Sequence, residues 1–310
     1  MLSRTADSLY WLARYLERAE NTARLLEVTH TLSLMPISAD PAGELATALE
    51  ISGAEALFGE LHGKPDADSV LHFFVFEPRN PGSILSCLKA ARDNAHAVRG
   101  SLTAEVWESV NATWLEMSRL TPAALADMGA GVFFDRIKER SHLFRGAAYG
   151  TMMRDDAFRF LRIGTFLERA DNTVRLLDFK YARSAHSNTL SAADYYQWTA
   201  LLRALGAFEA YQAFFHDRVR PEHVAELLIL NKVVPRSLAA CLNEIATILP
   251  DIEGDSGRGA KRMAAELSAS LSWGEIGPIL EEGVHAWLTA TLDRIHELGN
   301  AIHAAYLEAQ

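Results

Sequence analysis

The sequence lacks residues and segments that several common protein classes require. Among its 310 residues only Cys87 and Cys241 are cysteines, which is too few for a disulfide framework and does not fit the Cys/His spacing of structural zinc. No apolar run approaches the roughly 18 residues that span a bilayer. The charged start "MLSRTADSLYWLARYLER" does not fit a secretory signal. We therefore expect a cytoplasmic protein that does not enter a membrane.

Basic charge and phosphate-binding motifs are also scarce. The formal net charge is −10, whereas general nucleic-acid binding needs a basic surface that displaces phosphate counterions. The chain has no G-x-x-x-x-G-K-[ST] loop and no G-x-S-x-G nucleophile elbow. These absences argue against nucleic-acid binding, and they predict neither an ATP site nor a cofactor in this chain.

The sequence has a strong helical pattern. Ala, Leu, Glu and Arg dominate, and apolar residues recur at three- and four-residue spacing, while the alternation typical of strands is missing. We predict an all-α fold. The expected helices are 3–34, 43–61, 68–76, 83–98, 103–119, 134–150, 155–183, 192–215, 221–230, 235–249, 260–271 and 278–309.

One charged segment occurs twice. "YLERAENTARLLE" at 15–27 returns as "FLERADNTVRLLD" at 166–178, with nine of thirteen positions identical. Further along, an offset of 154 places Cys87 on Cys241 and Ser83 on Ser237. We interpret these matches as an internal duplication. The period is far longer than that of a solenoid repeat, so the duplication gives two related halves and not an array of short repeats. The expected architecture is two pseudo-repeated helical bundles, 1–150 and 151–310, packed into one globular unit.

The repeated segment gathers polar groups on one helix face. At 100° per residue, carboxylate, amide and guanidinium groups lie opposite an apolar face. Charge runs are usually solvated faces, yet both copies keep the same Glu, Arg, Asn and Arg, which indicates specific hydrogen bonds. The candidate ligand-binding residues are Glu17, Arg18, Asn21, Arg24, Glu168, Arg169, Asn172 and Arg175.

Two explanations of this retained face stay open. The side chains could form a buried structural network, in which every member needs a partner. They could instead bind an amino acid or peptide, with Arg donating two charge-assisted hydrogen bonds to a carboxylate and Glu accepting from an ammonium group.

Several segments resemble one known family. The paired "ERA(E/D)NT-R" helices, "ARDNAHAVR" at 91–99, "VWESVN" at 106–111 and "GTMMRDDAFRFLRIGTFLER" at 150–169 are similar to the bacterial alpha-E proteins, named for an all-α fold and a recurring Glu-Arg motif. The resemblance covers essentially the whole chain. It implies partnership with a circularly permuted ATP-grasp ligase and a transglutaminase-like protein, and hence a role in ATP-driven ligation or modification of peptides or amino acids. It assigns no reaction, so whether the chain is an enzyme stays open.

A di-metal site is one alternative function. Glu-x-x-His occurs at Glu139/His142 and at Glu282/His285, with Asp293/His296 as a variant. Residues three apart share a helix face, and two such pairs with two further carboxylates are the ligand set of di-iron helical bundles. This alternative treats the first two pairs as repeat equivalents.

A non-catalytic scaffold is another alternative. The segment "LHFFVFEPRNP" at 71–81 places Phe73 and Phe74 beside a Pro/Asn loop, where aromatic side chains can anchor an interface. In this hypothesis the protein docks its partner ligase through exposed phenylalanines.

Overall fold

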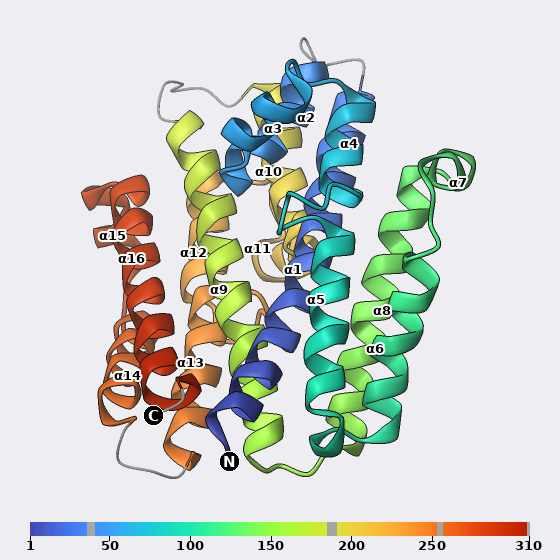
Figure 1. The fold of residues 1–310 in the computed structure, drawn as a ribbon. Helices are drawn as coiled ribbons and strands as arrows, with labels where there is room; N and C mark the ends of the chain where they lie inside the picture. Colours follow the sequence, from blue (N-terminus) through green and yellow to red (C-terminus); the bar gives the residue numbers. More distant parts are fainter. Residues whose placement is uncertain (36–40, 185–190, 253–256, 309–310) are drawn as a thin grey trace. The chain divides into compact units, whose positions relative to one another are not determined.

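The computed structural model describes residues 1–35, 41–184, 191–252 and 257–308, and throughout these residues the regular structure is helical (Figure 1). The predicted all-α class is therefore confirmed. No helix in the described ranges is both long and apolar enough to cross a bilayer.

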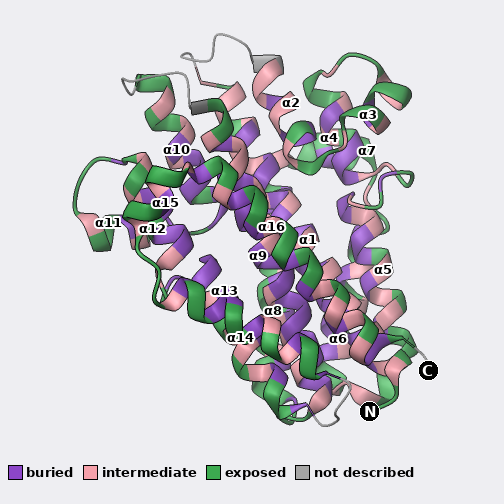
Figure 2. Cartoon of the chain, turned by 90° about the vertical axis from the view of Figure 1, so that its left-hand side faces the viewer, coloured by how far each residue is buried: buried purple, intermediate pink, exposed green. Residues whose placement is uncertain are grey.

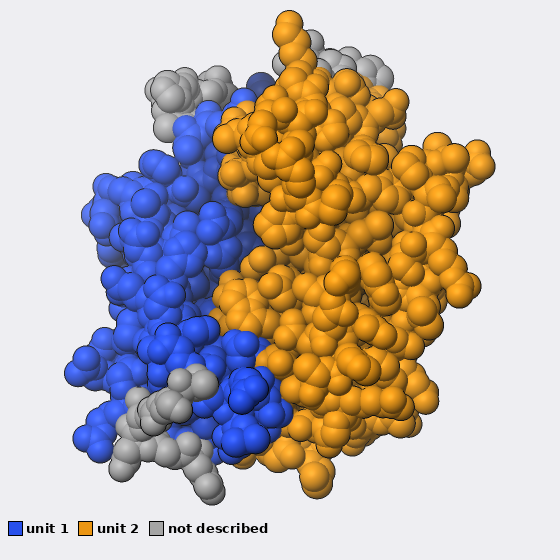
Figure 3. All heavy atoms as spheres, viewed as in Figure 1, with its two compact units in different colours: residues 1–7, 162–310 blue, residues 8–161 orange. Residues whose placement is uncertain are grey.

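The chain divides into two compact units, coloured separately in Figure 3. Unit 2 consists of residues 8–161, and unit 1 consists of residues 1–7 and 162–310. Each is described by itself.

Unit 2 starts within the first long helix, and its core lies between its long helices α5, α6 and α8. Helix α6 packs against both α5 and α8, and shorter helices connect them. Its elements are α1 (Ser3–Ser33, whose first five residues belong to unit 1), α2 (Pro41–Ser52), α3 (Glu55–His62), α4 (Ala67–Val75), α5 (Ile84–Ala97), the 3-10 turn η1 (Arg99–Ser101), α6 (Ala104–Met117), α7 (Pro122–Met128) and α8 (Ala130–Thr151).

Unit 1 has the same order of long and short helices. Helix α14 packs against both α13 and α16, and α15 packs against α12 and α16. Its elements are α9 (Asp156–Ser184, assigned to this unit from Arg162), α10 (Ala192–Ala204), α11 (Phe208–Phe215), α12 (Pro221–Leu230), α13 (Leu238–Ile248), the 3-10 turn η2 (Leu249–Asp251), α14 (Arg258–Ser272), α15 (Ile276–Glu282), α16 (Val284–Ile302) and the π-helical turn η3 (His303–Leu307).

Glycines with positive φ end helices that the sequence predicts to be continuous. Gly53 (φ +64°) separates α2 from α3, Gly206 (φ +58°) separates α10 from α11, and Gly283 (φ +101°) separates α15 from α16. Only glycine adopts these angles without a steric cost from Cβ. The predicted helices 43–61, 192–215 and 278–309 were therefore too long.

Side-chain caps and burial explain where α5 and α13 lie. Ser83 caps α5 by accepting from the Ser86 amide, and Ser237 caps α13 by accepting from the Ala240 amide. Cys87 and Cys241, one turn further on, are fully buried and unoxidised. Buried residues follow one side of the long helices and exposed residues the other (Figure 2), as amphipathic helices require.

Candidate functional site

The polar face of α1 is buried, not solvated. Glu17 is 2% exposed to solvent, and Glu20, one turn further on, is 0% exposed. Two adjacent carboxylates in such a setting need donors, because an unpaired buried charge is costly. This face of α1 is therefore not an ordinary solvated surface.

Helix α8 supplies a shared donor to these carboxylates. Arg145 Nη1 lies 2.9 Å from Glu17 Oε2 and 2.5 Å from Glu20 Oε2, and it also donates to Ser141 Oγ at 2.8 Å. One guanidinium of α8 thus binds the two buried acids of α1. Sequence analysis missed Arg145, since no local pattern connects it to residues more than 120 positions away.

Two more groups contact the other carboxylate oxygen of Glu20. Arg24 Nε donates to Glu20 Oε1 at 2.8 Å, and His142 Nε2 lies 3.7 Å from the same oxygen. The His142 side chain is 57% exposed, whereas the Glu20 carboxylate is covered. A buried carboxylate therefore holds a guanidinium and an imidazole at the surface of unit 2. We call Glu20, Arg24 and His142 the unit 2 triad.

Unit 1 contains the same arrangement on α9 and α16. Arg175 Nε donates to Asp171 Oδ2 at 2.7 Å, and His296 Nε2 lies 2.8 Å from Asp171 Oδ1. Arg175 Nη2 is also 3.3 Å from His296 Nε2, and the imidazole is 46% exposed. We call Asp171, Arg175 and His296 the unit 1 triad. In each unit the arginine follows the acid by four residues and the histidine comes from the last long helix.

The two triads differ in the support of their carboxylates. The position 154 beyond Arg145 is Gly299. A Cβ there would lie 3.2 Å from Leu167 Cδ2, so the α16 backbone approaches α9 closely. At the position that corresponds to Arg145, unit 1 therefore carries a residue without a guanidinium.

A second carboxylate–imidazole pair lies further along α9. His285 Nδ1, near the start of α16, is 2.6 Å from Asp178 Oδ1. With the Asp171–His296 contact, α9 and α16 therefore have two carboxylate–imidazole contacts at different positions along the helices. Imidazole and carboxylate thus provide polar contacts between these helices.

The predicted ligand-binding residues divide into buried and exposed groups. Glu17 and Arg24 enter the Glu20–Arg145 network, and Arg175 enters the unit 1 triad. Arg18 and Asn172 are partly exposed, whereas the remaining three are buried: Asn21, Glu168 and Arg169. The acids Glu20 and Asp171 were not among the ligand-binding residues predicted from the sequence.

The di-metal alternative paired the wrong residues of unit 1 with Glu139 and His142. Glu282 is the last residue of α15, and Gly283 breaks the chain before His285 in α16, so the two do not share a helix face. The histidine that lies 154 positions beyond His142, and that also contacts an acid of the repeated segment, is His296. Across the described residues no group of three or more His, Cys, Asp or Glu side chains is arranged to hold a metal ion.

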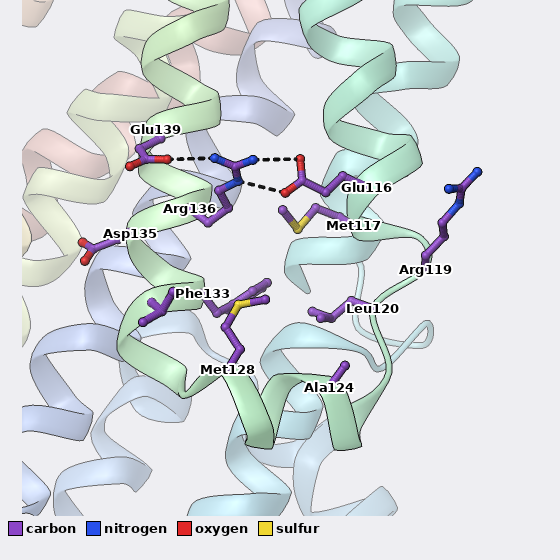
Figure 4. Close-up of a pocket in the computed structure, with 11 residues that line it drawn as sticks. Glu116, Met117, Arg119, Leu120, Ala124, Met128, Phe133, Asp135, Arg136 and Glu139 are labelled. Atoms are coloured by element: carbon purple, nitrogen blue, oxygen red, sulfur yellow. Dashed lines mark hydrogen bonds and ion pairs between the residues drawn. The ribbon is translucent and has the colours of Figure 1, made fainter.

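Glu139, the fourth member of that set, lies at the rim of a cavity of about 540 Å³ between α6, α7 and α8 (Figure 4). Its carboxylate faces Arg136, which is 3.2 Å away and also donates to Glu116 at 2.8 Å. Met117 and Phe133 line the floor. Glu139 is therefore engaged by an arginine.

The phenylalanines of the scaffold alternative belong to the core. Phe73 and Phe74 are 0% and 3% exposed, and Phe73 packs edge-on against Phe58. An interface anchor must be reachable by a partner. The prediction that these two side chains dock the ligase was wrong.

Comparison with known proteins places the chain in a family. Residues 1–307 match alpha-E, described as a predicted alpha-helical domain with a conserved ER motif. The chain belongs to the alpha-E family. In this alpha-E protein Glu17-Arg18 and Glu168-Arg169 are the Glu-Arg pairs of the repeated segment, on α1 and α9.

Similar curated proteins occur in mycobacteria. One protein of Mycobacterium bovis and two of Mycobacterium tuberculosis, all described as uncharacterised, are 26% identical to this alpha-E chain over 321 aligned positions. The alignments cover 94% of this chain but only 35% of each relative, so the chain spans about a third of their length. No solved structure matches the chain.

Proposed function

We propose that this alpha-E protein binds carboxylate groups of an amino acid or peptide at its two triads. The observation that carries the proposal is an arginine–histidine pair held by a covered carboxylate in both units. The histidine side chains are 57% and 46% exposed, and the arginine side chains are 16% and 40% exposed. Arg24 donates a hydrogen bond from Nε to Glu20, and its two terminal nitrogens make no hydrogen bond among the described residues. A guanidinium fork fixed in this way matches a carboxylate bidentately and loses little freedom on binding.

The acids have an orienting role in this proposal. Glu20 and Asp171 are engaged by arginine and histidine, so they position the donors and do not receive an ammonium group themselves. In the unit 1 triad the His296 imidazole lies 3.3 Å from Arg175 Nη2, so a ring nitrogen and the guanidinium can both face one ligand. The ligand's carboxylate would therefore lie between guanidinium and imidazole.

We also propose that units 1 and 2 are versions of one ancestral bundle. Gly129 precedes α8 with φ +87°, and Gly283 precedes α16 with φ +101° at the position 154 further on. Cys87 Sγ lies 3.5 Å from the Pro81 carbonyl, and Cys241 Sγ lies 3.7 Å from that of Pro235. These repeated details support a common origin of the two units. The two proposed sites are not identical, because Arg175 also donates from Nη2 to Asp171 at 3.3 Å.

The resemblance to alpha-E proteins suggests the setting of this binding. We propose a cytoplasmic system in which an ATP-grasp ligase activates a carboxyl group, a transglutaminase-like protein acts on the same peptides, and the alpha-E chain presents the peptide or amino acid. Activation needs ATP and belongs to the ligase. Binding needs only a fixed carboxylate receptor, which both triads could provide.

Calorimetric titration with the dipeptide glutamyl-glutamate tests the binding sites. Arg24→Gln and Arg175→Gln should each remove one class of site, and the double variant should remove both. Arg262→Gln, a change of an exposed arginine of α14 that lies 3.6 Å from Glu266, is the matched control. Unchanged titration of the double variant would show that the triads only hold helices together.

A further inference from the structure

A second surface cluster of unit 2 shares no residue with the triads. It is centred on Trp107 in the first turn of α6, with Arg92 and His96 from α5 and Arg99 from η1 around it. The Arg99 guanidinium carbon is 5.1 Å from the indole ring centroid and that of Arg92 is 5.9 Å away. The His96 ring centroid is 5.7 Å from the indole. We call these four side chains the Trp107 cluster.

Arg99 lies in the cluster without an ion pair to a described residue, whereas Arg92 is also paired with Asp93. Both guanidinium groups lie within the roughly 6 Å at which an aromatic face attracts a cation. Arg92 Nε is 3.5 Å from Asn111 Oδ1, a neutral acceptor. Arg99 forms no ion pair with any described residue, and its side chain is exposed at the surface.

Asp93, the acid beside the cluster, lies closer to a lysine than to Arg92. Asp93 Oδ2 accepts from Lys89 Nζ at 2.6 Å, and its other oxygen is 3.4 Å from Arg92 Nη1. The local charge from Lys89, Arg92, Arg99 and Asp93 is therefore 3 − 1 = +2, on a chain whose formal net charge is −10. On α6, Glu105 and Glu108 lie about 160° and 100° around the helix from the indole, so neither shares its face.

Packing of the two helices does not explain these side chains. Helices α13 and α14 of unit 1 pack against each other as α5 and α6 do. At the positions 154 beyond Arg92, Trp107 and Asn111, they carry Ala246, Lys261 and Ala265. The same helix pair therefore forms without a tryptophan flanked by arginines.

We propose that the Trp107 cluster docks an acidic segment of a partner protein. Aspartate or glutamate carboxylates would bind the open N–H groups of Arg99 and Arg92, and the indole would cover the methylene groups beside them. Tryptophan and arginine are the residue types most enriched at interaction hot spots. The local positive charge would attract an acidic partner, and the negative charge of the rest of the chain would disfavour its binding elsewhere, so the partner is directed to this cluster. This surface is separate from both triads.

Fluorescence anisotropy with a fluorescein-labelled octaglutamate peptide tests the proposal on the full chain. We expect saturable binding that weakens with added salt, and a loss of about tenfold in affinity for Arg99→Ala and for Arg92→Ala. Arg262→Ala removes the same charge from an exposed site on α14 and should bind within about twofold of the unchanged protein. Circular dichroism of each variant checks that helicity is retained.

Three results would overturn the proposal. One is the absence of octaglutamate binding, and another is an equal effect of Arg99→Ala and Arg262→Ala. The last is tighter binding of labelled oligothymidylate than of the peptide, which would make the cluster a nucleic-acid surface. The Arg24→Gln/Arg175→Gln double variant separates the two proposals: it should keep octaglutamate binding if the Trp107 cluster is the docking site, even if the triads bind nothing.

Discussion

Replacing Arg145 by methionine tests whether the α1 carboxylates form a buried network. The substitution keeps an unbranched apolar stem on α8 but removes the guanidinium that binds Glu17 and Glu20. The carboxylate side chains are 1% and 0% exposed and Arg145 is 25% exposed, so water would not replace the lost donor freely. Removing one partner of a buried ion pair costs about 3–5 kcal/mol.

We expect the free energy of unfolding to fall by about 3 kcal/mol, at the low end of that range because Arg145 is partly exposed and Glu20 keeps Arg24. Urea unfolding followed by circular dichroism measures the change. Arg136→Met is the matched control on the same helix, since its ion pairs with Glu116 and Glu139 are exposed. Such surface pairs contribute about 0–1 kcal/mol.

A rescue variant makes this prediction sharper. Adding Glu17→Gln to Arg145→Met removes one of the two carboxylates that lost the guanidinium, so part of the lost stability should return. If Arg145→Met costs no more than Arg136→Met and the added glutamine changes nothing, the carboxylates do not depend on this arginine and the buried network is refuted.

Three further predictions concern other parts of unit 2. Phe73→Ala should lower the free energy of unfolding by about 3–5 kcal/mol, because it empties a fully buried site; a loss below about 1 kcal/mol would contradict its core position. Gly129→Ala should cost about 1–3 kcal/mol, because φ +87° strains any side chain although nothing crowds the site, whereas Gly131→Ala within α8 should be neutral or stabilising. Burial raises the pKa of Glu116, but hydrogen bonds from two arginines of α8 outweigh it and hold the pKa below its usual 4.5. The stabilisation from Glu116 is therefore present above that pH and is lost as pH falls through the folded-state pKa. Glu116→Gln should make the free energy of unfolding in urea depend less on pH in the acid range. An unchanged pH dependence would refute this prediction.

The helical character and most helix positions could be predicted from local pattern. The predicted helix 221–230 matches α12 at both ends, and 155–183 lies within one residue of α9 at each end, because periodicity and flanking polar residues act within a few turns. Helix breaks were missed at Gly53, Gly206 and Gly283. An isolated glycine within a helical pattern does not reveal its φ, since neighbours in space decide whether the chain turns there.

The sequence by itself determined that the chain is helical, that its polar segment is repeated, and that the segment is not ordinary surface. Only the tertiary structure decided which side chains complete the site. Arg145 and His142 reach Glu20 from α8, and His296 reaches Asp171 from α16, each across more than 120 positions of sequence. The strength of these contacts depends on burial and on distances of a few ångströms between helices. A linear pattern does not encode those quantities, whereas the packing of α1 with α8 and of α9 with α16 fixes them.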